Sequence, residues 1–144
     1  MRAALELADA AASQGEVPVG AVVVVADRIV GRGANAPIGR CDPTAHAEIL
    51  ALREAGATLG NYRLETATLY VTVEPCAMCA GALVAARVSR LVFGTRDLRF
   101  GAVRSKFRLA DSDLLNHRVE VVEGVLAADC LSRLQRFFQQ KRDR

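Results

Sequence analysis

The segment 67–79, ATLYVTVEPCAMC, constrains the fold most, because a strand must end and a helix must begin within a few residues. Apolar and polar residues alternate along TLYVTV, which predicts a β-strand with its apolar side facing a core. Pro75 ends that strand, and the periodicity of 76–87 predicts a helix. A strand that leads directly into a helix is typical of a layered α/β protein.

The rest of the chain supports this class. Helices are predicted over 2–13, 45–56 and 125–144, and strands over 20–27, 28–33, 90–95 and 119–124. Thr44 is the expected N-cap of the second of these helices, with Gly56 near its end, and a tight turn is expected at 26–28. The segments 34–43, 57–66 and 96–117 are predicted as loops, so the chain should form an α/β fold with a partly parallel sheet.

Size and composition limit the class further. A chain of 144 residues suits one domain with one core, so we expect a single domain over residues 1–144. Apolar residues make up 51% of the chain and aromatic residues only 5%, so the core must consist of Ala, Val and Leu. A net charge of +3 does not by itself indicate a nucleic-acid binder.

The N-terminal residues and the lengths of the apolar runs indicate the compartment in which the protein acts. The N-terminal residues lack the apolar stretch of a signal peptide, and no apolar run reaches the length that spans a bilayer. We therefore expect a soluble cytoplasmic protein that does not enter a membrane. In such a reducing compartment, a Cys-x-x-Cys pair indicates metal binding or redox chemistry more than a structural disulfide.

Two short motifs indicate a catalytic zinc site. Cys76 and Cys79 are three residues apart at the start of a predicted helix, where free amides and the helix dipole favour thiolates. His46 opens another predicted helix and supplies a third ligand that zinc accepts. Three protein ligands leave a fourth position for water, and Glu48 is placed to shuttle protons to and from that water.

Other functions of these cysteines are weaker hypotheses. A redox pair of Cys76 and Cys79 would leave His46 and Glu48 unexplained. A structural zinc site would need a fourth ligand, and Cys41 lies in a Gly- and Pro-containing loop at a spacing from His46 that zinc sites do not commonly use. We expect Cys41 to be an incidental thiol and Cys130 to be a small core residue.

The order His-x-Glu followed by Pro-Cys-x-x-Cys is the signature of zinc-dependent nucleobase deaminases. Beyond these motifs, the chain resembles the bacterial tRNA adenosine deaminases over nearly its whole length. The resemblance rests on EVPVGAVVV, NAPIGRCDPTAHAEILALR, NYRLETATLYVTVEPCAMCAGALV, VFGTRD, NHRVEV and the C-terminal segment with Phe137 and Phe138.

The resemblance implies a three-layer α/β/α cytidine-deaminase-like domain with a central mixed five-stranded sheet. It also implies a cytoplasmic homodimer that converts adenosine to inosine at the wobble position of a tRNA anticodon. The residues that it implies are His46, Cys76 and Cys79 as ligands of one Zn²⁺ per subunit and Glu48 as the catalytic proton shuttle. It also implies Asn35 and Asp97 as substrate-binding residues, with Asn35 contacting the flipped nucleoside and Asp97 lying near the loop of the anticodon stem-loop.

One segment departs from the family pattern. After Asp97 the sequence continues LRFGAVRSKF, where the family more often has Lys-x-Gly-Ala-x-Gly-Ser. Seven basic residues occur within 87–108, which makes a phosphate-binding edge a reasonable hypothesis. Glu74, beside Pro75, is expected to stabilise the start of the following helix.

Two other functions remain open at this point. A deaminase of free guanine, cytosine or their nucleosides would use the same four residues but would need no basic RNA surface. A non-catalytic partner subunit that binds zinc and RNA is the other alternative, although such partners typically lack the shuttle glutamate that is present here as Glu48.

Overall fold

The computed structural model describes residues 1–144 as ten helices and strands. In chain order they are α1 (Arg2–Ser13), β1 (Gly20–Val25), β2 (Arg28–Ala34), α2 (Pro37–Arg40), α3 (Ala47–Leu59), β3 (Thr68–Val73), α4 (Ala77–Ala85), β4 (Arg90–Thr95), β5 (Glu120–Glu123) and α5 (Ala127–Arg142). None of the helices is both long and apolar enough to cross a bilayer.

The five strands form one mixed sheet in the order β2-β1-β3-β4-β5. Strand β1 is antiparallel to β2 and to β3, whereas β3, β4 and β5 run parallel to one another. Strands β2, β3 and β4 therefore run in the same direction, and their carboxyl ends lie at one edge of the sheet. Residues that follow these three strands meet at that edge, which is where α/β proteins commonly bind ligands.

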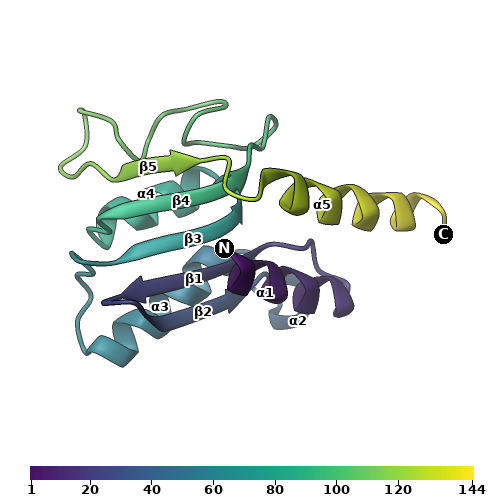
Figure 1. The fold of residues 1–144 in the computed structure, drawn as a ribbon, viewed down its shortest axis with the longest axis horizontal. Coiled ribbons are helices and arrows are strands. Elements are labelled where there is room, and N and C mark those ends of the chain that lie inside the picture. Colours follow the sequence, from purple (N-terminus) through teal and green to yellow (C-terminus); the bar gives the residue numbers. More distant parts are fainter.

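Helices cover both faces of the sheet, so the predicted three-layer α/β fold with a mixed five-stranded sheet is confirmed (Figure 1). Helices α3 and α4 lie behind the sheet in Figure 1, and α1 and α5 lie in front. The main core is a cluster of 19 buried residues between the sheet and the layer of α3 and α4. Alanine, valine and leucine make up most of it, as the composition predicted.

Helix α3 lies unusually close to strand β2, and glycines make this possible. A Cβ atom on Gly33 would lie 2.0 Å from the carbonyl oxygen of Ala47, and one on Gly31 would lie 2.2 Å from that of Ala51. The helix face that meets them is alanine, with Ala47, Ala51 and Ala55 fully buried. Because Ala47 is the first residue of α3, Gly33 sets where this helix begins relative to the sheet.

The largest differences from the sequence-based expectations are local. The predicted loop 34–43 contains the short helix α2, and α3 begins at Ala47 with His46 as its N-cap, not with Thr44. The Thr44 hydroxyl instead donates a hydrogen bond to Asp42 at 2.7 Å. Gly56 lies inside α3, and the helix ends at Gly60, whose left-handed φ of +64° suits glycine. The expected tight turn is present, with Ala26 and Asp27 both left-handed.

Replacing Gly33 by alanine should destabilise the protein by about 1–3 kcal/mol or more, because the added methyl group overlaps backbone atoms that cannot rotate away. Gly81→Ala is the matched control: a Cβ at position 81 meets nothing within 4 Å, and alanine in a helix is favoured by about 0.5–1 kcal/mol. Thermal and denaturant unfolding of both variants test this. Equal stability of the two would show that the approach of α3 to β2 is not tight.

Candidate metal and substrate site

Two helices begin at the same place, and their first residues bring the sequence motifs together. His46 is the N-cap of α3 and Cys76 is the N-cap of α4, both with extended backbone. Cys79 follows in the first turn of α4 and is buried. The positive ends of both helix dipoles therefore face this point, which favours thiolate and other anionic ligands.

The side chains of His46, Cys76 and Cys79 form the one group of potential metal ligands in the structure. Their donor atoms all lie within 4.8 Å of one another. The Nδ1 atom of His46 is 3.6 Å from Sγ of Cys76 and 3.5 Å from Sγ of Cys79. Tetrahedral zinc with ordinary Zn–S and Zn–N bond lengths separates its sulfur and nitrogen ligands by about 3.6 Å. The donor set therefore fits zinc in both chemistry and spacing.

Glu48 lies two residues into α3 beside this group and is buried. Burial raises the pKa of its carboxyl to about 7, because removal from water disfavours the charged form. The pKa of Cys76 is lowered to about 4, chiefly by the hydrogen bond from Cys79 and also by that with His46. His46 and Glu48 can face one point although they are two residues apart, because that point lies beyond the end of the helix and not along its side.

A cavity of about 590 Å³ opens onto these side chains at the carboxyl edge of the sheet. This volume is in the range of small-ligand sites. Asn35, which follows β2, and Asp97, which follows β4, both line the cavity together with His46, Glu48 and Cys76. The structure thus brings five of the six predicted site residues to one cavity, and Cys79 lies beneath it as the buried member of the ligand group.

Asn35 and Asp97, which line the cavity, both form hydrogen bonds within the chain. Asn35 donates a hydrogen bond from Nδ2 to the carbonyl of Val17 at 3.3 Å, which fixes the orientation of its amide. The Asp97 carboxylate accepts hydrogen bonds from the backbone of Arg99 at 3.0 Å and of Phe100 at 3.1 Å. Asp97 therefore shapes the loop that it begins, in addition to lining the cavity.

Glu74 has a larger role than the sequence suggested. Its buried carboxylate does not cap α4 but accepts backbone hydrogen bonds from Asp97, Val103, Arg104 and Ser105 at 3.1, 3.0, 2.7 and 2.9 Å, and one from the Ser105 hydroxyl. These bonds lower the pKa of Glu74 against the opposing effect of its burial. A single carboxylate, one residue before Pro75, thus holds the loop 97–105 against the start of α4.

The same contact explains the glycine at position 101 in the divergent segment. A Cβ on Gly101 would lie 2.4 Å from the Glu74 carboxyl carbon, so only glycine fits there. Gly101, Ala102 and Ser105 match the pattern that the family resemblance implies for this segment, and Arg104 stands where that pattern has a glycine. The Arg104 guanidinium pairs with both carboxylate oxygens of Asp111, at 3.1 and 3.0 Å. No sequence pattern pairs these residues with Glu74, since the contact spans about thirty positions of the chain.

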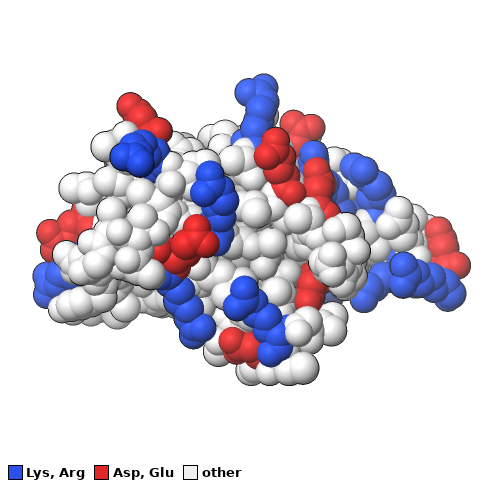
Figure 2. All heavy atoms as spheres, turned by 90° about the horizontal axis from the view of Figure 1, so that it is seen from below, with Lys and Arg blue, Asp and Glu red and all other residues white.

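The basic segment 87–108 is less available to phosphate than its charge count indicated. Arg90 pairs with Glu120, Arg96 and Arg104 with Glu123, and Arg108 with Asp111. Arg87 donates to Asn116. Arg99 and Lys106 form no salt bridge. Figure 2 shows the molecule from below, a side other than that of β4 and β5 in Figure 1, and there too Lys and Arg side chains lie among Asp and Glu side chains.

The other phenylalanine, cysteine and histidine residues considered in the sequence analysis each have a defined environment in the structure. Phe137 is buried and packs edge-on against Phe138, which is 43% exposed and lines the site cavity. Cys130 is buried against Gly94, as expected for a core residue, and Cys41 is exposed outside the ligand group. His117 bonds to the carbonyl of Val88 at 2.8 Å, a structural contact.

Comparison with known proteins identifies the class that this fold and site define. The model of the MafB19-like deaminase family matches residues 1–142. The tRNA-specific adenosine deaminase of Haemophilus influenzae is 54% identical over 144 residues, covering 99% of this chain and 83% of that protein. The chain belongs to the deaminase family, and within it to the tRNA-specific adenosine deaminases.

Solved structures agree with this assignment. A structure from studies of A-to-I editing by tRNA:A34 deaminases at the wobble position of transfer RNA superposes with a TM-score of 0.90 and 41% identity, covering 93% of this chain and 97% of that one. The guanine deaminase of Nitrosomonas europaea is more distant, with a TM-score of 0.80 and 26% identity over 93% of this chain and 80% of that one.

Replacing Glu74 by glutamine should loosen the loop 97–105 without removing any of the three candidate metal ligands. In either orientation the glutamine NH₂ group faces at least one backbone N–H, so a buried donor loses its acceptor at a cost of about 1–3 kcal/mol. We expect faster hydrogen exchange at Val103, Arg104 and Ser105, with unchanged zinc stoichiometry. Glu65→Gln, at an exposed carboxylate, is the control; exchange in the loop that matches this control would contradict the role of Glu74.

Proposed function

We propose that the protein is a zinc-dependent hydrolytic deaminase that converts adenosine to inosine at the wobble position of a tRNA anticodon. The main supporting observation is that His46, Cys76 and Glu48 line a cavity of about 590 Å³, with Cys79 completing the group of potential metal ligands beneath it. The tRNA-specific adenosine deaminase of Haemophilus influenzae is 54% identical to this chain over 99% of its length, which supports tRNA as the substrate.

The catalytic roles follow from the position of each side chain. His46, Cys76 and Cys79 would hold zinc, which supplies a Lewis acid that lowers the pKa of water. Glu48 takes one proton from the water whose oxygen bonds to C6 of adenine, and it passes this proton to the exocyclic amino group, which leaves as ammonia when the C6–N bond breaks. The second proton of that water ends on N1 of the product. The burial of Glu48 beside the ligand group keeps the carboxyl within reach of both positions and away from bulk solvent.

The substrate roles follow from the cavity walls. Asn35 precedes the proposed metal ligands in the sequence and Asp97 follows them, but both line the same cavity. We therefore assign Asn35 to contacts with the nucleoside and Asp97 to contacts with the anticodon loop. An adenosine in a stem-loop can reach the floor only after it is splayed out from its neighbours. A tRNA substrate also supports cytoplasmic action.

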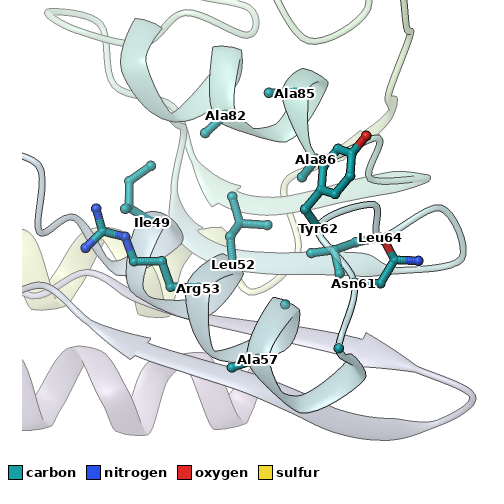
Figure 3. A pocket seen from close by; sticks show the side chains of 12 residues that line it. Ile49, Leu52, Arg53, Ala57, Asn61, Tyr62, Leu64, Ala82, Ala85 and Ala86 are labelled. Atoms are coloured by element: carbon teal, nitrogen blue, oxygen red, sulfur yellow. The ribbon is translucent and has the colours of Figure 1, made fainter.

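The other large cavity supports a homodimer. Helices α3 and α4 leave between them an open cavity of about 640 Å³, lined mainly by apolar residues that include Ile49, Leu52 and Ala82 (Figure 3). Tyr62 at its edge is 75% exposed. An apolar surface of this kind on a helix layer is typical of subunit contacts, and we propose that a second copy of the chain packs there. Sedimentation at several concentrations tests the dimer, and a monomer at all of them would exclude it.

The zinc-loaded protein should form inosine in an anticodon stem-loop that carries adenosine at the wobble position, with little turnover of guanine, cytosine or free adenosine. Glu48→Gln should lower kcat by about 100-fold or more, since it removes the proton acceptor but keeps the shape of the site. Mass spectrometry of the RNA and an ammonia assay measure both reactions.

Metal content separates the proposed roles. Glu48→Gln should bind zinc like the wild type, whereas Cys79→Ala should lose it, because two ligands do not make a stable site. Turnover of guanine with an inert stem-loop would retain the metal chemistry but overturn the proposed substrate. Editing that persists in Glu48→Gln would overturn the proton-shuttle role.

A further inference from the structure

Glu16 is a buried acid that the proposed mechanism leaves without a role. It lies between α1 and β1, is only 3% exposed, and forms no salt bridge. Its Oε1 accepts a hydrogen bond from the backbone N–H of Ile38 at 3.2 Å, and its Oε2 accepts one from that of Gly39 at 2.8 Å. A buried carboxylate without a cation is costly unless hydrogen bonds satisfy it, so these two amides account for its place in the interior.

The two amides belong to the first turn of α2, which has no cap of its own. The N–H groups of a first helical turn lack partners within the helix, and a side chain at the N-cap usually accepts them. The N-cap of α2 is Ala36, which makes no such bond. Glu16 therefore supplies, from another part of the chain, the acceptor that the local sequence lacks. A Cβ on Gly39 would lie 3.3 Å from Oε2, so the helix lies directly against the carboxylate.

Glu16 also anchors a segment that packing barely holds. Helix α2 buries none of its residues, and Ile38 is 68% exposed. Apart from the two bonds to Glu16, every hydrogen bond of residues 37–44 is made with another residue of 36–46. The position of α2 relative to the sheet is therefore set by this carboxylate and by the two ends of the segment.

The residues that follow Glu16 hold the adjoining wall of the site cavity. The carbonyl of Val17 accepts the Asn35 side-chain bond described above, and the carbonyl of Val19 accepts the backbone N–H of Asn35 at 3.0 Å. Pro37, the first residue of α2, lines the cavity together with Asn35, whereas Glu16 does not line it. Glu16 can therefore act on a substrate only through the wall that Asn35 and Pro37 form.

We propose that Glu16 is a positioning residue for the deamination, which holds α2 so that Asn35 and Pro37 keep their places in the cavity wall before the nucleoside binds. The proposal rests on the proposed function and adds to it a residue outside the cavity. When a wall is in its binding position for only a fraction of the time, the apparent affinity for the substrate falls by that fraction. A bound nucleoside restores the wall, so loss of the Glu16 carboxylate weakens binding and leaves the reaction of bound substrate nearly unchanged.

The test is the kinetics of anticodon stem-loop editing by the zinc-loaded Glu16→Gln variant. Glutamine keeps the size of the side chain, but its NH₂ group faces one of the two backbone N–H groups, so one buried donor loses its acceptor. KM should rise by about tenfold, and kcat per bound zinc should stay within about twofold of the wild type. Hydrogen exchange at Ile38 and Gly39 should become faster. The matched control is Glu6→Gln, the same change at an exposed glutamate of α1 that forms no salt bridge.

A second substitution separates positioning from general destabilisation. Asn35→Ala removes part of the wall that Glu16 is proposed to hold. Adding Glu16→Gln to Asn35→Ala should therefore raise KM much less than Glu16→Gln raises it in the wild type, because the two changes act on one element. A purely structural role predicts a smaller folded and zinc-bound fraction, an unchanged KM, and independent effects of the two substitutions.

Each result decides a separate point. If the wild type does not edit the stem-loop, the proposed function fails, and the positioning role fails with it. If the wild type edits but Glu16→Gln has the KM of Glu6→Gln, the positioning role alone is wrong. If KM rises while Ile38 and Gly39 exchange as they do in the wild type, Glu16 does not act through α2, and the proposal fails in its mechanism.

Discussion

The backbone of α3 touches the backbone of β2, and the position of the whole site depends on this contact. Gly33 has no room for a Cβ beside the Ala47 carbonyl, so the first residue of α3 is placed by the sheet itself. His46 and Glu48 lie on either side of Ala47. Helix α4 begins directly after β3, so Cys76 is placed by the same sheet. Two helix starts fixed by one rigid element bring three donor atoms within 4.8 Å without any long flexible connection.

This dependence explains which features could be predicted from the sequence. The ligands, the strand before Cys76 and the alternation of strands and helices are local patterns, and they predicted the α/β class and the His46, Cys76 and Cys79 group. Once β2, β3 and β4 are known to run in the same direction, Asn35, Glu74 and Asp97 follow three carboxyl ends at one edge. Sheet order is a long-range property, and short patterns do not determine it.

The N-cap of α3 shows why local rules failed where they did. Thr44 has the side chain of a good N-cap, but Asp42 takes its hydroxyl and the chain enters the helix two residues later. The helix start is fixed by the contact of Ala47 with Gly33 and not by capping chemistry. The basic segment is a similar case: its charge density was visible in the sequence, but the acids that neutralise it, Glu120 and Glu123, lie on a neighbouring strand.

Glu74 connects the two halves of the site. Its backbone continues into Pro75 and Cys76, and its carboxylate holds the loop that carries Asp97, Leu98 and Phe100. The carboxylate is buried and fully engaged, and Gly101 leaves no space for it to move, so a shift of this loop would require a shift at the start of α4. Glu74 therefore fixes the position of Asp97 relative to the proposed zinc ligands on α4. Substitutions within 98–106 that keep Gly101 and the backbone bonds to Glu74 can change the exposed side chains of this loop without moving those proposed ligands.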